Sequence, residues 1–161
     1  MATVEQVEQL PLFHRETIPT DYLDLMGHMN IRWYLALYDT AAWKFFESFG
    51  MTENYYRSEQ AGGFALKQFI QYLAEVRVGE TVAIHGRLLG RSAKRIHFML
   101  FMVNETTRVL ASTIEVLGSH ADMRIRRTSP YPPQIAEKLD AAIAQQSKLD
   151  WDAPACGVIS P

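Results

Sequence analysis

The segment from residue 31 to residue 49 limits what this chain can fold into more than any other. Its apolar side chains recur at steps of three and four residues, which indicates a helix. They form two series, namely Tyr34, Leu37, Tyr38, Ala41 and Phe45, and then Leu35, Ala42, Phe46 and Phe49. Only one narrow strip is left for solvent, with Arg32, Asp39, Thr40 and Glu47. A helix with so little polar surface must be wrapped by other elements, and we predict that a sheet wraps it.

Both ends of this helix carry sequence signals. Asn30, or else His28, is placed to cap the N-terminus. Gly50 takes the position of the glycine that commonly follows the last helical turn. The polar segment 51–60 is expected to be a short helix or a loop.

Strand patterns lie on both sides of the helix, and most of them follow it. Residues 12–20 precede the helix with ragged alternation, and Gly62-Gly63 marks a break after it. The later strand segments are residues 64–78, 82–89, 95–103 and 108–118. The segment 82–89 alternates and should be half exposed, whereas 95–103 is apolar on both faces and should be central. Connections this short require antiparallel pairing.

The C-terminal part begins with an extended basic segment, 124–133, which leads to a helix with Pro133 at its first position. The tail 148–161 should be loose or held only at Trp151. Together the elements predict an α+β fold of the hot-dog type, with a curled antiparallel sheet around one long central helix plus a C-terminal helix. We expect a single domain over 1–161, with its core at about 12–120 and the crossing, helix and tail at 121–161.

Composition limits the compartment and the partners. With 161 residues, 48% hydrophobic and 21% charged, the chain is typical of one globular domain. A formal charge of −2 gives no general attraction to nucleic acid or to anionic membranes. The single Cys156 excludes an internal disulfide and fits a reducing compartment. Because we find no signal peptide and no bilayer-spanning run, we expect a cytoplasmic protein. The open edges of the predicted sheet favour a homodimer or homotetramer.

The turn before the long helix, residues 24–30, reads Asp-Leu-Met-Gly-His-Met-Asn. It places a carboxylate and an imidazole beside the free N–H groups of a helix N-terminus, which is how a site for an acyl oxygen is built. Structural alternatives exist for each polar residue. They are a turn cap for Asp24, a buried hydrogen-bonding role for His28 and a helix cap for Asn30.

This turn, with Tyr34 ten residues after Asp24, resembles acyl-CoA thioesterases of the 4-hydroxybenzoyl-CoA thioesterase type. The resemblance extends from about residue 13 to about residue 117. In that family the aspartate of the D-x-x-G turn is the catalytic carboxylate, which implies the same role for Asp24. The resemblance implies hydrolysis of a small acyl-CoA to the free acid and CoA, with no cofactor. The other histidines lack metal-ligand spacing, so we expect no metal site and a structural role for His14, His85, His97 and His120.

Thioester hydrolysis gives each part of the turn a task. Asp24 would act as a general base on water or as a nucleophile. Backbone amides would polarise the carbonyl group. The amides considered are those of Gly27, His28, Met29 and Asn30, or those of Gly62 and Gly63 from the same or a neighbouring subunit. The residues expected to contact the substrate are Asn30, Trp33, Tyr34 and Tyr38.

A basic cluster at residues 91–95 is the second informative feature. It contains Arg91, Ser92, Lys94 and Arg95. These side chains at a hairpin would hold the phosphates of CoA, and the resemblance supports this because the family places basic residues there. The alternative is a solvated turn. A second basic cluster, at Arg124, Arg126 and Arg127, is expected to be structural or to lie at a subunit contact.

Ring-bearing residues near the site exceed what binding an acyl chain needs. They are Trp33, Tyr34, Tyr38, Trp43, Tyr55 and Tyr56. Aromatic faces attract quaternary ammonium groups. The aromatic helix and the tail 149–157 also resemble a thioesterase branch associated with carnitine degradation, whose substrate is betainyl-CoA. We therefore predict that betainyl-CoA is cleaved faster than straight-chain esters of similar size.

Two functions of other classes remain as alternatives. The first is a non-catalytic acyl-CoA binding or sensor protein, in which Asp24 only orients the ligand. The second is a hot-dog hydratase or dehydratase. That activity needs an acid/base pair on the acyl chain, in differently spaced His and acidic motifs that we do not find.

Overall fold

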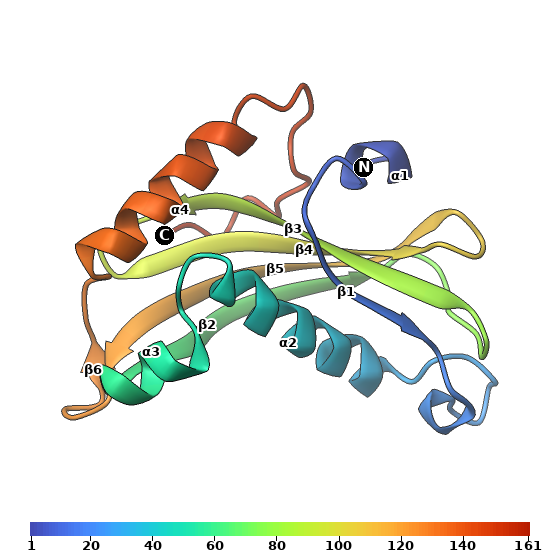
Figure 1. The fold of residues 1–161 in the computed structure, drawn as a ribbon. Helices are drawn as coiled ribbons and strands as arrows, with labels where there is room; N and C mark the ends of the chain where they lie inside the picture. The colour runs from blue at the N-terminus through green and yellow to red at the C-terminus, as the bar shows by residue number, and fades with distance from the viewer.

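One antiparallel sheet of six strands curls around helix α2, as the computed structural model of the whole chain, residues 1–161, shows (Figure 1). The strands are β1 (Leu12–Thr17), β2 (Ala61–Tyr72), β3 (Thr81–Arg91), β4 (Arg95–Asn104), β5 (Val109–Asp122) and β6 (Arg127–Thr128). The helices are α1 (Val4–Val7), the 3-10 helix η1 (Thr20–Tyr22), α2 (Ile31–Glu47), α3 (Glu53–Ser58) and α4 (Pro133–Gln146). The strands lie in the order β1-β3-β4-β5-β2, with β6 beside β5. The predicted α+β hot-dog architecture is confirmed.

Helix α2 begins and ends close to its sequence signals. The side chain of Asn30 accepts a hydrogen bond from the Arg32 amide (3.1 Å) and caps the first turn. Gly50 has a φ of 91°, which glycine adopts without steric cost. The following polar segment contains α3, one of the two structures expected for it.

The sheet covers one side of α2 and leaves the other side open. The first apolar series packs in the core, with Tyr34, Leu37, Tyr38, Ala41 and Phe45 all buried. On the other side, Leu35 and Trp43 keep exposed fractions of 46% and 51%. The opposite side of α2 stays open because a curled sheet has a single concave face. Neither α2 nor any other helix is long and apolar enough to cross a membrane.

Strands β2 and β3 differ from prediction. Strand β2 begins at Ala61, so that Gly62 and Gly63 pair with β5 instead of marking a break, and it ends at Tyr72 instead of residue 78. Strand β3 is buried on both faces and not half exposed. The reason is that α4 and the C-terminal tail cover its outer face, where Arg87 donates to the Trp151 carbonyl (2.8 Å).

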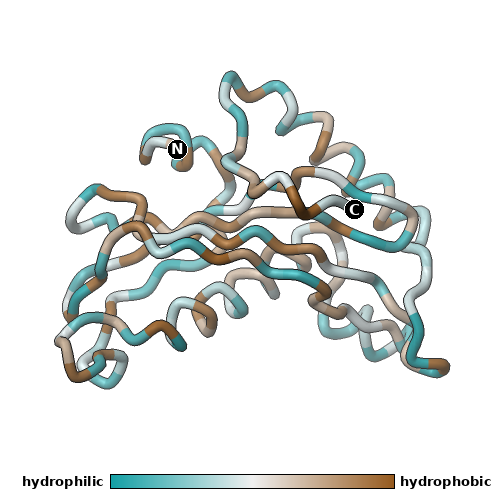
Figure 2. Tube along the Cα trace, turned by 180° about the vertical axis from the view of Figure 1, so that it is seen from behind, coloured by the Kyte–Doolittle hydropathy of each residue, from teal (hydrophilic) through white to brown (hydrophobic).

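A second apolar cluster lies on the outer face of the sheet, where α1, α4 and the tail are found in Figure 1. It joins Val7 of α1 to Phe101 of β4 and to Trp151. Figure 2 shows apolar residues along the strands between this layer and α2. The tail is not held only at Trp151, because the Cys156 amide donates to Glu115 (2.6 Å) and Ile159 is buried. The core therefore extends beyond the expected residues 12–120.

Strand β2 forms one edge of the sheet. Leu66, Phe69 and Tyr72 on this strand are 44%, 41% and 47% exposed. A long open edge with exposed apolar side chains is a surface that proteins normally cover.

Candidate active site

The turn before α2 holds the carboxylate of Asp24 close to the surface, with 16% of the side chain exposed. Its Oδ1 accepts a hydrogen bond from the Met26 amide (2.8 Å), and its Oδ2 lies 3.3 Å from Nδ1 of His28. Gly27 closes the turn with a φ of 84°, and its amide donates to the Asp24 carbonyl (3.1 Å). Asp24 thus caps its own turn with one oxygen and presents the other toward the imidazole. The structural and the chemical interpretation of this residue are compatible.

Most amides of this turn are already used. In addition to Gly27, the amide of Met29 donates to the Val76 carbonyl (2.7 Å), and that of Asn30 donates to Tyr22 (2.9 Å). Of the four amides considered in the sequence, only that of His28 has no acceptor in the chain. The structure therefore reduces the donors that this turn can offer to an acyl oxygen.

Asn30 and Trp33 have structural contacts. The side-chain oxygen of Asn30 is the N-cap of α2. The ring of Trp33 stacks on Tyr22, with centroids 3.7 Å apart and an interplanar angle of 10°. These contacts hold the turn against the start of α2.

Tyr34 and Tyr38 lie deeper. Tyr34 borders a small pocket of about 280 Å³ next to His28, and its hydroxyl donates to the Ala74 carbonyl (3.4 Å). Burial raises the pKa of Tyr34 to about 12. Tyr38 is 2% exposed and lies away from the turn, where it lines the larger cavity described next. Of the four residues expected to contact substrate, Tyr34 is the one that borders the pocket beside the turn.

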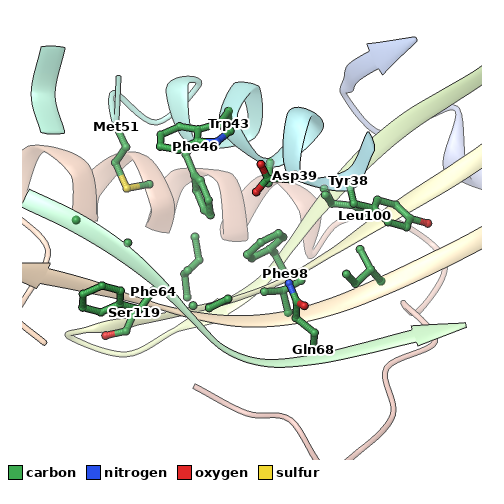
Figure 3. Close-up of a pocket in the computed structure, with 18 of the residues that line it drawn as sticks. Tyr38, Asp39, Trp43, Phe46, Met51, Phe64, Gln68, Phe98, Leu100 and Ser119 are labelled. Atoms are coloured by element: carbon green, nitrogen blue, oxygen red, sulfur yellow. The ribbon is translucent and has the colours of Figure 1, made fainter. Parts of the chain in front are cut away.

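A larger cavity of about 670 Å³ lies between α2 and the sheet (Figure 3). Its walls come mainly from α2, β2, β4 and β5 and are mostly apolar. Trp43 and Phe46 of α2 and Phe64 of β2 bring their rings to it. One carboxylate, that of Asp39, lines it as well. The sequence pattern assigned Asp39 to the solvent strip, and Asp39 is exposed, but nothing in that pattern signals that it also borders a cavity.

Gly62 and Gly63 line the same cavity, but they differ in what they permit. A Cβ atom at Gly62 would lie 2.6 Å from the sulfur of Met123, so glycine there allows close packing of that side chain. A Cβ atom at Gly63 would lie 3.7 Å from the Tyr56 hydroxyl, which is ordinary contact. The close approach at Gly62 is therefore explained without a substrate.

The basic cluster at the β3–β4 hairpin divides into engaged and available residues. Arg91 forms an ion pair with Asp140 of α4 through two hydrogen bonds (2.7 and 2.5 Å). The hydroxyl of Ser92 accepts the Arg95 amide (3.2 Å) and closes the turn. Lys94 and Arg95 have exposed side chains that make no ion pair in the chain. Of the four residues expected to bind CoA, these two are available to a phosphate group.

The second basic cluster lies beside the first. The amide of Tyr131 donates to the Ala93 carbonyl (3.0 Å), which ties the segment after β6 to the hairpin. Arg124 pairs with Asp122 (2.6 Å), whereas Arg126 and Arg127 are exposed. The two clusters thus form one basic end of the molecule.

The Asp24 turn and this basic end lie at opposite ends of the sheet. The turn is tied to Val76, just after the end of β2 at Tyr72. At the other end, Gly62 and the hairpin meet, because Arg95 pairs with Ser119 and Ser119 with Phe64. The ten residue steps from Gly62 to Tyr72 span about 33 Å of strand. Within one chain, Asp24 cannot share a thioester with Gly62 or Gly63.

Among the remaining histidines, His120 is the one that lines the large cavity. Its Nε2 lies 2.7 Å from the Tyr55 hydroxyl, and its Nδ1 lies 3.1 Å from the Ser129 carbonyl. Burial lowers the pKa of His120, although the hydrogen bond to Ser129 acts in the opposite direction. The ring is therefore neutral at pH 7, with its Nδ1–H donated to the Ser129 carbonyl.

Comparisons with known proteins identify the family. The family model of the thioesterase-like superfamily matches residues 18–139. The curated L-carnitine dehydrogenase/betainyl-CoA thioesterases of Agrobacterium fabrum and Rhizobium meliloti are 29% and 24% identical over 83% and 80% of this chain. The chain spans only 27% and 26% of the length of these two relatives. A hypothetical protein from Staphylococcus aureus, solved in complex with CoA, has a TM-score of 0.81 at 23% identity, covering 89% of this chain and 90% of that one. Residues 24–30 predicted a thioesterase from the sequence alone. The chain belongs to the thioesterase-like superfamily.

Proposed function

We propose that this chain is an acyl-CoA thioesterase in which Asp24 performs the hydrolysis. The observation that carries the proposal is the turn before α2. It fixes one oxygen of the carboxylate through the Met26 amide and keeps the His28 amide without an acceptor beside it. An unused N–H beside the carboxylate can donate to the negative charge that develops on the thioester oxygen during attack. Membership of the thioesterase-like superfamily supports this assignment.

Two chemical routes need a carboxylate but no second catalytic side chain. As a general base, Asp24 takes a proton from water while the water oxygen attacks the carbonyl carbon. As a nucleophile, Asp24 attacks the carbon itself, and water later hydrolyses the resulting mixed anhydride. In both routes the C–S bond breaks and CoA leaves as a thiolate, so that one water is consumed and the free acid is formed. Because a thiolate is a good leaving group, no Ser-His-Asp triad is needed.

The site we propose is shared between two subunits. Two chains whose β2 edges pair antiparallel about a twofold axis would bring the Asp24 turn of one next to the basic end of the other. Lys94 and Arg95 of the partner subunit would then hold the CoA phosphates. The exposed apolar residues Leu66 and Phe69 along the β2 edge favour such pairing. A homodimer is the smallest assembly that meets this requirement, and a homotetramer of two such dimers meets it too.

The substrate we propose is betainyl-CoA, which would give the protein a role in carnitine metabolism in the cytoplasm. Both curated relatives combine L-carnitine dehydrogenase with betainyl-CoA thioesterase in their names, and the chain matches about a quarter of their length. Its match to a thioesterase-like family model favours the thioesterase of the two activities. The CoA bound to the Staphylococcus aureus protein of the same fold supports a CoA ester as ligand.

The proposal is tested by thiol release from a panel of CoA esters with the purified protein. The panel contains betainyl-CoA and straight-chain acyl-CoAs from four to sixteen carbons. We expect betainyl-CoA to have the highest kcat/KM, because quaternary ammonium groups bind to aromatic faces. A preference for medium or long chains would contradict the substrate. Binding of CoA esters without any thiol release would contradict the thioesterase and favour an acyl-CoA binding protein.

A further inference from the structure

The large cavity between α2 and the sheet contains a charged side chain that a pocket for a simple acyl chain does not need. Of its 25 lining residues, 17 are hydrophobic, and one of the others is the carboxylate of Asp39. Asp39 makes no hydrogen bond through its side chain and no ion pair in the chain. Asp39 is exposed, so its charge is solvated and free to pair with a cationic ligand bound in the cavity.

Aromatic rings lie close to this carboxylate. Asp39 and Trp43 are one turn apart on the same face of α2, and Phe46 follows on that face. The ring of Trp43 meets the ring of Tyr56 edge-to-face, with centroids 5.8 Å apart. Burial raises the pKa of Tyr56 to about 12, so its ring carries no charge at neutral pH. A carboxylate next to two such rings is the combination that proteins use to bind quaternary ammonium groups.

The other charged side chains of the cavity do not oppose this role. Arg32 lies two helical turns before Asp39, about 10 Å along the axis, and its guanidinium is placed over the ring of Trp33 (5.2 Å). His120 is neutral at pH 7, as described above. Asp39 is therefore the one acidic side chain among the residues that line the cavity.

We propose that Asp39, together with the rings of Trp43 and Tyr56, binds the cationic end of the acyl group. Asp39 is then the residue that sets acyl specificity. This inference rests on the thioesterase function proposed above. The cavity is lined by the first half of β2, including Gly63 and Phe64. In an antiparallel β2 pair, that half of the strand faces the Asp24 turn of the partner subunit. The thioester would then lie at the subunit contact with its cationic group in the cavity.

The test compares two esters of the same shape. Betainyl-CoA carries a trimethylammonium group, and in 3,3-dimethylbutanoyl-CoA a carbon atom replaces its nitrogen. We expect the ratio of kcat/KM for the cationic ester to that for the neutral ester to fall about tenfold or more in Asp39→Asn. The loss should be mainly in KM, because the charge contact is present in both the ground state and the transition state. Trp43→Leu, which keeps an apolar side chain without a ring, should lower the same ratio.

Glu47→Gln is the matched control, because Glu47 lies on the same helix and is exposed outside the cavity. It should keep the wild-type ratio. A ratio unchanged in Asp39→Asn, or one lowered equally in Glu47→Gln, overturns the proposal.

A direct binding measurement distinguishes failure of the proposed thioesterase function from failure of the cation pocket. If the wild type hydrolyses neither ester, the function proposed above is wrong, but the cation pocket can still be measured. Tetramethylammonium ion, titrated against tryptophan fluorescence, should bind the wild type and bind Asp39→Asn about tenfold more weakly. Equal affinity for both proteins, or no binding to either, contradicts the cation pocket.

Discussion

Asp24→Asn is expected to lower kcat/KM for CoA-ester hydrolysis by about 10²-fold or more, while the protein stays folded. The amide oxygen of asparagine can still accept the Met26 amide that Asp24 accepts at 2.8 Å, so the turn keeps its cap. An amide can neither take a proton from water nor attack the thioester carbon. The loss should therefore fall on kcat, since the substitution leaves Lys94 and Arg95, the residues proposed to bind CoA, unchanged.

Asp21→Asn is the control for this measurement. Asp21 lies three residues earlier in η1 and is exposed, so the substitution makes the same change in charge without touching the proposed site. It should leave kcat/KM within about twofold of the wild type. Wild-type turnover by a folded Asp24→Asn protein would place the hydrolysis elsewhere and contradict the mechanism.

Glu115→Ala is expected to destabilise the protein by about 3 kcal/mol, the largest single effect on stability that we foresee. Glu115 has no exposed surface, and its two oxygens accept His97 Nε2 (2.7 Å) and the Cys156 amide (2.6 Å). Removal leaves the buried His97 nitrogen without its acceptor and frees the tail at Cys156. In a chain of this length the melting temperature should fall by about 6–12 °C.

Glu105→Ala is the matched control for that measurement, because Glu105 pairs with Arg15 at the surface, where ion pairs contribute little. It should leave the melting temperature nearly unchanged. Equal melting temperatures for Glu115→Ala and the wild type would show that the contacts of Glu115 with His97 and Cys156 do not stabilise the fold.

The same glutamate gives the stability a pH dependence. Burial raises the pKa of Glu115, but the hydrogen bonds from Cys156 and His97 outweigh it and bring the pKa below the usual 4.5. Because the pKa is lower in the folded state, the stabilisation by ionised Glu115 is complete above about pH 4.5. It is lost as the pH falls through the folded-state pKa of Glu115. The difference in stability between wild type and Glu115→Ala should therefore shrink below that pH.

The long helix, its caps and the antiparallel order of the strands were predictable from local pattern. Asn30 and Gly50 act through neighbours in sequence, so their positions reveal the helix ends. The full length of β2 was not predictable, because Gly62 and Gly63 carry a breaker signal that pairing with β5 overrides. The burial of β3 depends on α4 and the tail, which lie far away in the sequence.

In the candidate site, too, local features were predictable from the sequence and distant contacts were not. The Asp24 turn is local, and its residues are read directly from positions 24–30. By contrast, Arg91 has the sequence context of a phosphate ligand but is engaged by Asp140, 49 residues away. Asp39 is exposed, as its position predicts, but it also borders the large cavity that forms where α2 packs against the sheet. Such contacts depend on tertiary packing and leave no local pattern.

Mixing two inactive variants tests most directly the claim that Asp24 of one subunit acts on a CoA ester held by the other. One variant is Asp24→Asn, and the other carries Lys94→Glu and Arg95→Glu. After the subunits are exchanged at equal amounts, half of the dimers are mixed, and each mixed dimer contains one intact site if the site is shared. About a quarter of the wild-type activity should return. If the mixture stays as inactive as its components, although subunit exchange is verified, Asp24 and the basic end do not work together across a subunit contact.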